Sequence, residues 1–264
     1  MAMRGHEPGK TVTSKVLALL AAFEGGSERL RLSDMAARSG VAVSTAHRLV
    51  TELTTWGALQ RGEDGRYQVG IRIWELGQHA ARELTEVAHP YLHDLFELTR
   101  ENVHLSIRQG TDVLYLERFY GSRRVPLIAQ VGGRLPLHPT AVGKVILAYE
   151  EAWFRDTYLA RTLERRTAFT ITEPGRLSRE LLQIRAQGYA VTREEIRLGT
   201  CSVAVPVLSA QGTCHAAIGI VMATGRAVEL PRLVAPLQGT ARRVEAALWP
   251  GLVKSRPAHS LWHA

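Results

Sequence analysis

Five polar side chains near residue 47 have the types and the spacing needed to contact double-stranded DNA. Four fall on one face of an expected helix and the fifth lies on its flank: Ser44, His47, Arg48 and Thr51, then Thr45. An arginine side chain can read guanine or hold a phosphate, and hydroxyl and imidazole groups make weaker contacts of both kinds. Little acid lies in the first half of this segment. A helix with this face is suited to the major groove of DNA.

Two short helices are expected to position this polar face. The first begins at Ser33, whose hydroxyl is expected to cap it, and ends at Gly40, which suits a left-handed residue. Ser44 is expected to cap the second helix, whose buried stripe is Ala46, Leu49, Val50 and Leu53. A glycine corner that lets one helix cross another steeply is typical of a helix-turn-helix. Ser33 joins the five residues above among the expected DNA contacts.

Residues 58–70 predict a β-hairpin directly after the second helix. Apolar and polar residues alternate at both ends of this stretch, and Asp64-Gly65 is typical of the turn between two strands. Arg61 and Arg66 flank the tip and can contact backbone phosphates. An ordinary amphipathic helix pair with a glycine between the helices would give part of the same pattern. The order of capped helix, glycine corner, polar helix and hairpin favours a winged helix-turn-helix.

The composition is that of a globular protein. The chain has 264 residues, more than one average domain, with 45% hydrophobic and 22% charged residues. Neither a secretory leader nor a run of roughly 18 apolar residues is found, so we expect no membrane span and a cytoplasmic location. The two cysteines give neither a disulfide framework nor a metal-binding spacing. We therefore expect no metal and no cofactor.

The formal net charge of +8 permits an anionic partner but does not locate a DNA-binding face. Residues 1–80 hold 10 Lys/Arg and 8 Asp/Glu, a net of +2, while the remaining residues hold 23 and 17, a net of +6. The DNA-binding hypothesis therefore depends on the polar helix face and not on the total charge.

Residues 75–88 are expected to form a linker helix between a DNA-binding domain at 10–74 and a second domain at 89–250. Apolar residues along this stretch form a narrow stripe: Ile73, Leu76, Ala80, Leu84 and Val87. Such a stripe favours pairing with a second chain, or alternatively packs on its own domain. Pro90 marks the expected entry to the second domain, and residues 251–264 are expected to form a flexible tail.

The second domain is expected to be an α+β domain. Strands are expected at 103–109, 113–119, 125–131, 202–208 and 215–222. Helices are expected at 141–149, 151–160, 178–187 and 232–248. Gly110-Thr111 and residues 209–212 are typical of hairpin connections, and Thr140 is expected to cap a helix. This grouping predicts helices packed on an antiparallel sheet.

Several stretches resemble the IclR-type bacterial transcriptional regulators. In the first domain these are SKVLALLAAF, LSDMAARSGVAVSTAHRLVTELTTWGAL and GRYQVGIRIWELG. In the second they are GGRLPLHPTAVGKVILA, LLQIRAQGYAVTREEIRLGTCSVAVPV and AAIGIVM. The resemblance runs from about Val12 to Leu248. It implies a winged helix-turn-helix, a linker helix and an α/β effector-binding domain. It also implies homodimers or homotetramers on a palindromic operator and control by a small organic effector, as a repressor or an activator.

The resemblance also implies where an effector binds. The residues that it implies are Leu135, Ala141, Val142, Thr192, Glu195, Ser202, Gly219 and Val221. Free backbone N–H groups at the start of the helix expected at 141–149 can bind a carboxylate. Ser202 stands where a cysteine is common and Thr192 where an aspartate is frequent. Gly219 and Val221 stand where members that bind small polar acids often have serine. These departures predict a more apolar effector, aromatic or longer-chained.

Other reactive or charged residues have more ordinary interpretations. His138 is expected to order its own loop. Lys144 either meets an anionic effector or lies in solvent near a helix end, and Glu195 either contacts the effector or orders its loop. Cys201 and Cys214 are expected to be small buried residues and not redox sensors.

Two other functions compete with an effector-controlled regulator: a hydrolase-like enzyme and a DNA-binding protein that ignores metabolites. The chain has no GxSxG elbow, no HExxH motif and no glycine-rich phosphate loop, so no catalytic residue is expected. The second domain is larger than dimerisation requires, which favours an effector sensor.

Overall fold

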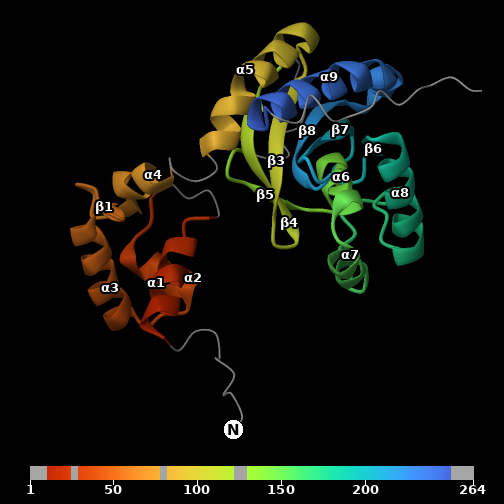
Figure 1. The fold of residues 1–264 in the computed structure, drawn as a ribbon. Helices are drawn as coiled ribbons and strands as arrows, with labels where there is room; N and C mark the ends of the chain where they lie inside the picture. Colours follow the sequence, from red (N-terminus) through yellow and green to blue (C-terminus); the bar gives the residue numbers. More distant parts are fainter. Residues whose placement is uncertain (1–10, 25–28, 78–81, 122–129, 251–264) are drawn as a thin grey trace, which may run out of the picture. The chain divides into compact units, whose positions relative to one another are not determined.

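The protein consists of two compact units, Met1–Arg82 and Glu83–Ala264, and each is described by itself. The computed structural model describes residues 11–24, 29–77, 82–121 and 130–250 (Figure 1). Within these ranges no helix is both long enough and apolar enough to cross a membrane.

Three helices and a hairpin make up the core of the first unit. The helices are α1 (Val12–Ala21), α2 (Leu32–Ser39) and α3 (Val43–Trp56), and the hairpin strands are β1 (Leu59–Arg61) and β2 (Tyr67–Val69). The stripe predicted on α3 is buried at Ala46, Leu49 and Val50, which belong to one cluster with Leu19 and Met35. Because this stripe faces the core, the opposite face of α3 lies in solvent.

The corner after α2 confirms the role of Gly40, while the start of α2 differs from expectation. Gly40 has φ 66° and ends α2 in the left-handed conformation. The helix starts at Leu32, so Ser33 is not its cap. The Asp34 carboxylate instead accepts the Arg31 N–H at 3.0 Å. This contact is one half of a capping box, in which the side chain of the third helical residue accepts from the backbone N–H of the N-cap residue.

The start of α3 also precedes the predicted residue. The helix begins at Val43 with Ala42 as its N-cap residue, so Ser44 lies in the first turn and does not cap it. The turn between α2 and α3 consists of residues 40–42 only. The N-cap position of α3 therefore falls on Ala42, two residues before Ser44. Ser44 is exposed, and its hydroxyl remains on the outer face.

The predicted hairpin is confirmed, with a loop of residues 62–66 between its strands. Leu59 pairs with Val69 and Arg61 with Tyr67. The Gly62 N–H closes the loop by donating to the Arg66 carbonyl at 2.8 Å.

Helices α4 (Ile71–Gly77) and α5 (Arg82–Thr99) stand on either side of residues 78–81, which lie outside the described residues. A continuous linker helix at 75–88 therefore stays a prediction, and Ala80 of its stripe is not described. Pro90 does not mark an entry to the second domain, since it lies inside α5. The helix continues through the proline because its apolar face packs in a core of the second unit.

The second unit is built on one antiparallel sheet with the strand order β5-β4-β3-β8-β7-β6. The strands are β3 (Asn102–Gln109), β4 (Asp112–Phe119), β5 (Arg134–Pro136), β6 (Ala190–Arg193), β7 (Thr200–Leu208) and β8 (Cys214–Ala223). Gln109 pairs with Asp112 across the turn at Gly110-Thr111, and Leu208 pairs with Cys214 across the second predicted connection. Both hairpins are confirmed.

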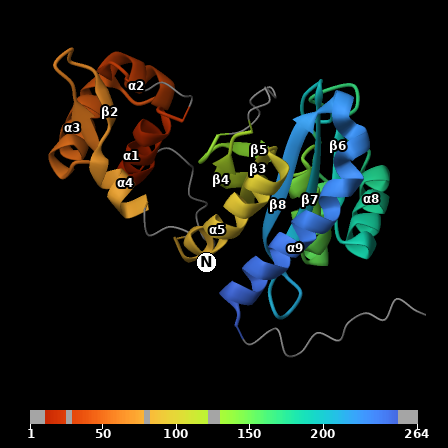
Figure 2. The ribbon, with the colours of Figure 1, turned by 90° about the horizontal axis from the view of Figure 1, so that it is seen from above.

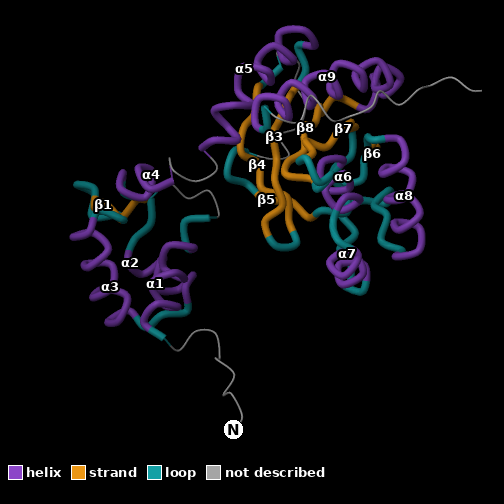
Figure 3. The backbone as a smooth tube through the Cα atoms, viewed as in Figure 1, coloured by secondary structure: helices purple, strands orange, loops and turns teal. Residues whose placement is uncertain are grey.

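Helices cover both faces of this sheet. In Figures 1 and 2, α5 and α9 (Leu230–Leu248) lie along one face, while α6 (Ala141–Tyr149) and α8 (Pro174–Gln187) lie on the other, with α7 (Ala152–Leu159) next to them. Val203, Val205 and Val207 pack under α5 and α9, and Ala204 between them packs under α6. Figure 3 shows the same layers, with strands between helices. A 3-10 turn, η1 (Thr224–Glu229), precedes α9.

The four helices predicted for the second domain are confirmed with small shifts, whereas two short strands are not predicted. β5 and β6 have three and four residues, which is too few for an alternating pattern to appear. The strand expected at 125–131 is absent from its described part, because Gln130 and Val131 are not in a strand and the chain turns at Gly132. Residues 122–129 and the tail at 251–264 lie outside the described residues.

Candidate functional site

The polar face of α3 lies in solvent and carries the side chains predicted to contact DNA. Four of them are exposed, Ser44, His47, Arg48 and Thr51, and Thr45 is half-buried on the flank. Ser33 is also exposed, in the first turn of α2. Arg48 Nη1 lies 2.9 Å from Glu52 Oε1, and the two side chains are 61% and 62% exposed. Because a surface pair of this kind contributes little to stability, Arg48 can exchange Glu52 for a phosphate or a base.

Three arginines gather at the hairpin of the first unit. Arg61 and Arg66, which the sequence selects, are exposed. Arg29, which it does not select, lies 3.8 Å from Asp64 through Nη1, and Arg66 Nε lies at the same distance. Arg29 is placed by the bridge between the neighbouring Leu30 and the hairpin. Long-range pairing of this kind leaves no local pattern in the sequence.

A cavity in the second unit lies between the start of α6 and one face of the sheet. A single row of paired residues crosses four strands beneath it: Asn102 on β3, Val221 on β8, Ser202 on β7 and Thr192 on β6. Paired residues of antiparallel strands point to the same face, so these four side chains form a floor. Walls come from the first turn of α6 and from the loop after β6. The space that the centre of a water-sized molecule can occupy is about 30 Å³, within about 570 Å³ of empty space that includes open solvent.

Six of the eight residues that the resemblance implies line this cavity: Ala141, Val142, Thr192, Glu195, Ser202 and Val221. Leu135 is not brought to it, because it pairs with Val113 through the edge strand β5. Gly219 lies directly behind the lining. A Cβ there would come within 2.5 Å of His104 Nε2 and 2.8 Å of Val142 Cγ1, so the missing side chain lets these two residues approach each other.

Further lining residues come from β3, β4, the start of α6 and the segments around β6 and β7. They are Asn102, His104, Tyr115, Arg118, Thr140, Glu194, Ile196, Thr200 and Cys201. His104 pairs with Arg118 on one side and with Gly219 on the other, across more than one hundred intervening residues in the second case. These positions carry no local sequence pattern because strand pairing alone brings them together.

Among the residues of β3 and β4 that line the cavity, only Arg118 is charged at pH 7. The pKa of His104 falls to about 3, first because the ring is buried and then because Arg118 repels a second positive charge, so the ring is neutral at pH 7. Burial raises the pKa of the Tyr115 phenol, which keeps its proton. Burial lowers the pKa of Arg118, and Tyr120 and Tyr115 oppose this effect. The Arg118 guanidinium keeps its charge and lies over the Tyr120 ring at 4.6 Å.

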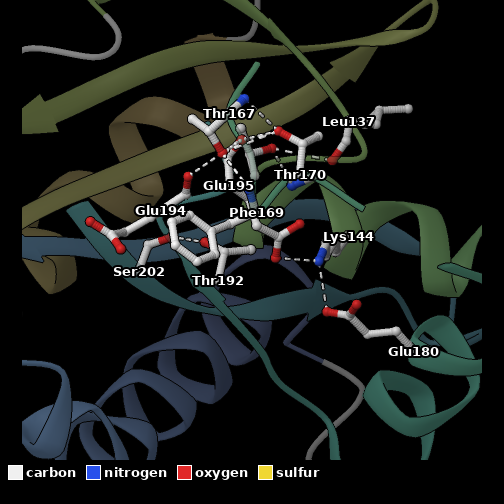
Figure 4. A network of polar contacts seen from close by, with 12 residues as sticks. Leu137, Lys144, Thr167, Phe169, Thr170, Glu180, Thr192, Glu194, Glu195 and Ser202 are labelled. Carbon is white, nitrogen blue, oxygen red and sulfur yellow. Dashed lines mark hydrogen bonds and ion pairs between the residues drawn. The ribbon is translucent and has the colours of Figure 1, made fainter. Parts of the chain in front are cut away.

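Lys144 is completely buried next to the cavity, so of the two alternatives for this residue, an anionic effector or solvent, the position in solvent is wrong. Figure 4 shows Nζ between two carboxylates, 2.6 Å from Glu195 Oε1 and 2.7 Å from Glu180 Oε1 on α8. The Thr170 hydroxyl donates to the Glu195 carbonyl at 2.6 Å, and the Thr167 hydroxyl donates to the Glu194 carbonyl at the same distance. A buried ammonium group needs carboxylate partners, and Lys144 has them in Glu180 and Glu195. Glu195 therefore orders its loop and lines the cavity as well.

His138 and the cysteines have the structural positions expected of them. His138 is buried, with Nδ1 3.1 Å from the Tyr158 hydroxyl and Nε2 2.9 Å from the Glu164 carbonyl, so the ring fastens two loops. Cys201 is buried and Cys214 is half-buried. Burial raises the pKa of Cys201 to about 11, and the thiol stays protonated. Among the described ranges, no group of three or more His, Cys, Asp or Glu side chains is placed to hold a metal.

Comparisons with known proteins cover both units. Residues 12–63 match the model of the IclR helix-turn-helix domain, and residues 79–246 match that of the bacterial transcriptional regulator IclR C-terminal domain. The HTH-type transcriptional regulator XynR of Escherichia coli (strain K12) is 31% identical over 80% of this chain and 86% of its own. The glycerol operon regulatory protein of Streptomyces coelicolor is 33% identical over 90% of this chain and 96% of its own.

One solved structure resembles this chain over most of its length. It is an IclR homolog from Microbacterium hydrocarbonoxydans complexed with 4-hydroxybenzoate, with a TM-score of 0.85 and 32% identity over 90% of this chain and 99% of that one. The family match extends over most of the chain, the exposed face of α3 suits DNA, and the matched relatives regulate transcription. The chain therefore belongs to the IclR family of bacterial transcriptional regulators, with a DNA-binding helix-turn-helix and a C-terminal effector-domain fold.

Proposed function

We propose that a small aromatic carboxylate, bound in the cavity of the second unit, controls the affinity of this regulator for its DNA operator. The observation that carries the proposal is the composition of the cavity. Apolar side chains of Val142, Ile196 and Val221 line the cavity, and Arg118 lines it from β4. An aromatic ring fits the first feature and a carboxylate fits the second.

The start of α6 also favours an anion in this cavity. Ala141 and Val142 belong to the first turn of α6, whose backbone N–H groups have no carbonyl one turn earlier in the helix. Those N–H groups and the positive end of the helix dipole favour a carboxylate. The IclR homolog from Microbacterium hydrocarbonoxydans was solved with 4-hydroxybenzoate, an aromatic carboxylate, which supports the same chemical class for this chain.

We infer further that the regulator works as a homodimer or homotetramer on a palindromic operator in the cytoplasm. We propose the parts expected from the sequence: a DNA-binding domain at 10–74, a linker helix at 75–88, an effector-binding domain at 89–250 and a tail at 251–264. An effector controls DNA binding only if it binds one arrangement of the assembly more tightly than another. The linker helices are the elements through which such a difference can reach the recognition helices.

Thermal-shift screening tests the choice of effector class. Benzoate and phenolic acids should raise the melting temperature, because apolar side chains line the cavity, while glyoxylate and pyruvate should not. Val221→Phe fills the floor and serves as the control, which should bind DNA and show no thermal response to the acids. Stabilisation by the small keto acids alone would overturn the proposed class.

Footprinting tests the link to DNA. The protein should protect a palindromic site upstream of its own gene or of a neighbouring gene, and an aromatic acid that stabilises it should change the protection. A footprint that ignores every stabilising acid would favour a regulator that acts without an effector.

A further inference from the structure

The loop at the tip of the hairpin in the first unit brings several arginines to one carboxylate. Asp64 Oδ2 lies 3.8 Å from Arg29 Nη1 and 3.8 Å from Arg66 Nε. Arg61 reaches the same turn, because a Cβ at Gly65 would lie 3.7 Å from Arg61 Nη2. Three guanidinium groups therefore lie at the turn that holds Asp64.

Two of these arginines are also held by contacts that do not involve Asp64. Arg29 precedes Leu30, which bridges to Tyr67 of β2, and Arg29 Nε donates to Gln68 Oε1 at 3.1 Å. The guanidinium carbon of Arg61 lies 5.7 Å from the centre of the Tyr67 ring, at the distance of a cation–π contact. Their guanidinium groups should therefore stay near the turn when the carboxylate is removed.

The ion pairs of Asp64 are of the kind that another anion can replace. The Asp64 side chain is 44% exposed, and those of Arg29 and Arg66 are 54% and 46% exposed. Exposed ion pairs contribute little to stability and are screened by salt. A phosphate accepts hydrogen bonds from guanidinium groups as a carboxylate does, often two at a time. A phosphate at this turn can therefore take the place of Asp64 with little loss of stability.

The position of the hairpin makes DNA the source of such a phosphate. The hairpin lies next to α3, whose exposed face carries the side chains predicted to contact DNA (Figures 1 and 2). Backbone phosphates line both edges of the groove that a recognition helix enters. A duplex held by α3 therefore brings phosphates toward the elements packed beside that helix.

We propose that Arg29 is a further phosphate-binding residue of the DNA-binding unit, and that Asp64 competes with DNA for Arg29 and Arg66. Arg29 precedes α2 in the chain, so it adds a contact from outside the recognition helix and the hairpin. Asp64 lowers the affinity for any duplex, because its carboxylate must leave the two guanidinium groups before a phosphate binds them. Phosphates carry no sequence information, so both effects should be the same for every DNA sequence.

Fluorescence anisotropy of the full-length protein with an unrelated, non-palindromic duplex tests the role of Asp64. Asp64→Asn should keep the turn, since Asn-Gly is equally typical there and the amide oxygen can still accept the Arg66 N–H, as Asp64 Oδ1 does at 3.2 Å. We expect this variant to bind the duplex about fivefold more tightly at low salt.

Glu63→Gln is the matched control for Asp64→Asn. It removes the same charge from the neighbouring position, and Glu63 is exposed and forms no ion pair within the described part of the chain. Its gain in affinity should not exceed about twofold, because it changes the net charge without releasing an arginine. Equal gains from the two variants would overturn the role of Asp64 as a competitor.

A second pair of variants tests Arg29. Arg29→Ala should weaken binding about fivefold and make the dependence of log affinity on log salt shallower by about one unit, as expected for the loss of one phosphate contact. Arg179→Ala, at an exposed arginine of α8 in the second unit, should change both quantities little. Thermal melting checks that each variant is folded. Equal affinities and slopes for the two alanine variants would overturn the assignment of Arg29.

The double variant tests whether Asp64 acts through Arg29. Adding Asp64→Asn to Arg29→Ala should give a smaller gain than in the wild type, because one of the two guanidinium groups that Asp64 occupies is gone. The same gain with and without Arg29 would show that Asp64 acts through net charge alone and would overturn the proposed competition. None of these measurements depends on the effector of the second unit.

Discussion

Arg48 and Lys144 show how the surroundings of a cation decide its use. Arg48 is more than half exposed and has only a surface contact with Glu52, so its charge is available to a partner. Lys144 is fully buried, and its charge is balanced by Glu180 and Glu195. The first residue is positioned for recognition, and the second holds the loop that forms one wall of the cavity.

Arg48→Ala should weaken operator binding about tenfold or more, because the variant loses a base or phosphate contact. The fold should be intact, since Arg48 packs no core side chain. Fluorescence anisotropy at fixed salt measures the affinity, and thermal melting checks the fold. Arg179→Ala, an exposed arginine of α8, removes the same charge as a control. Equal affinities of the two variants would mean that Arg48 does not contact DNA.

Because His104 is buried and neutral, the free energy of unfolding should fall in mild acid. Its pKa is about 3 in the folded protein, against 6.5 for an unperturbed histidine, so below pH 6.5 the unfolded chain binds a proton that the folded one does not. The stability that depends on neutral His104 is present above pH 6.5 and is lost as the pH falls toward 3. Between pH 6.5 and pH 5, the free energy of unfolding should fall by about 1.5 kcal/mol more in the wild type than in His104→Gln.

Urea unfolding at the two pH values measures this difference, because the other titrating groups are shared by both proteins. An equal loss of stability in the wild type and in His104→Gln would contradict a neutral, buried ring.

At the scale of elements, the position of α6 depends on a close contact with the preceding loop. A Cβ at Gly143 would lie 2.2 Å from the Leu137 carbonyl oxygen and 2.5 Å from Thr140 Oγ1. Gly143→Ala should therefore destabilise the protein by about 2 kcal/mol, because either the loop or the helix must move. Chemical denaturation measures this loss.

Gly175→Ala is the matched control in the first turn of α8. A Cβ at Gly175 meets nothing within 4 Å, so this substitution should be neutral or stabilise the protein by less than about 1 kcal/mol. Similar effects of the two alanine variants would show that the contact at Gly143 is not close.

Local patterns predict the helices of this protein well and its cavity only in part. The apolar stripe of α3 and the Thr140 cap of α6 involve residues within a few positions of each other, and both are found where the sequence places them. Asn102, His104 and Arg118 are brought to the cavity by strand pairing over long sequence separations. The burial of Lys144 depends on Glu195, which lies fifty-one residues later. Contacts between residues so far apart in the sequence are seen only in the folded structure.

At the scale of the whole molecule, recognition of a palindrome requires two copies of α3 at a fixed separation. Half-sites read by one dimer lie about one helical turn, roughly 34 Å, or a multiple of it apart. Inserting about 5 base pairs between the half-sites should abolish tight binding, because the second site turns to the opposite side of the DNA. Inserting about 10 base pairs restores the side and should recover part of the affinity.

Gel-shift titration on the three operators measures this dependence. Binding that is indifferent to the insertion of half a turn would show that a single copy of α3 suffices.

The two outermost strands of the sheet, β5 and β6, have three and four residues, and β5 ends at Pro136. Proline has no backbone N–H to donate, and short edge strands offer few backbone groups to an incoming strand. Growth of the sheet into fibrils by strand addition is thereby discouraged. We therefore expect overexpressed chains not to join through strand pairing at these two edges of the sheet.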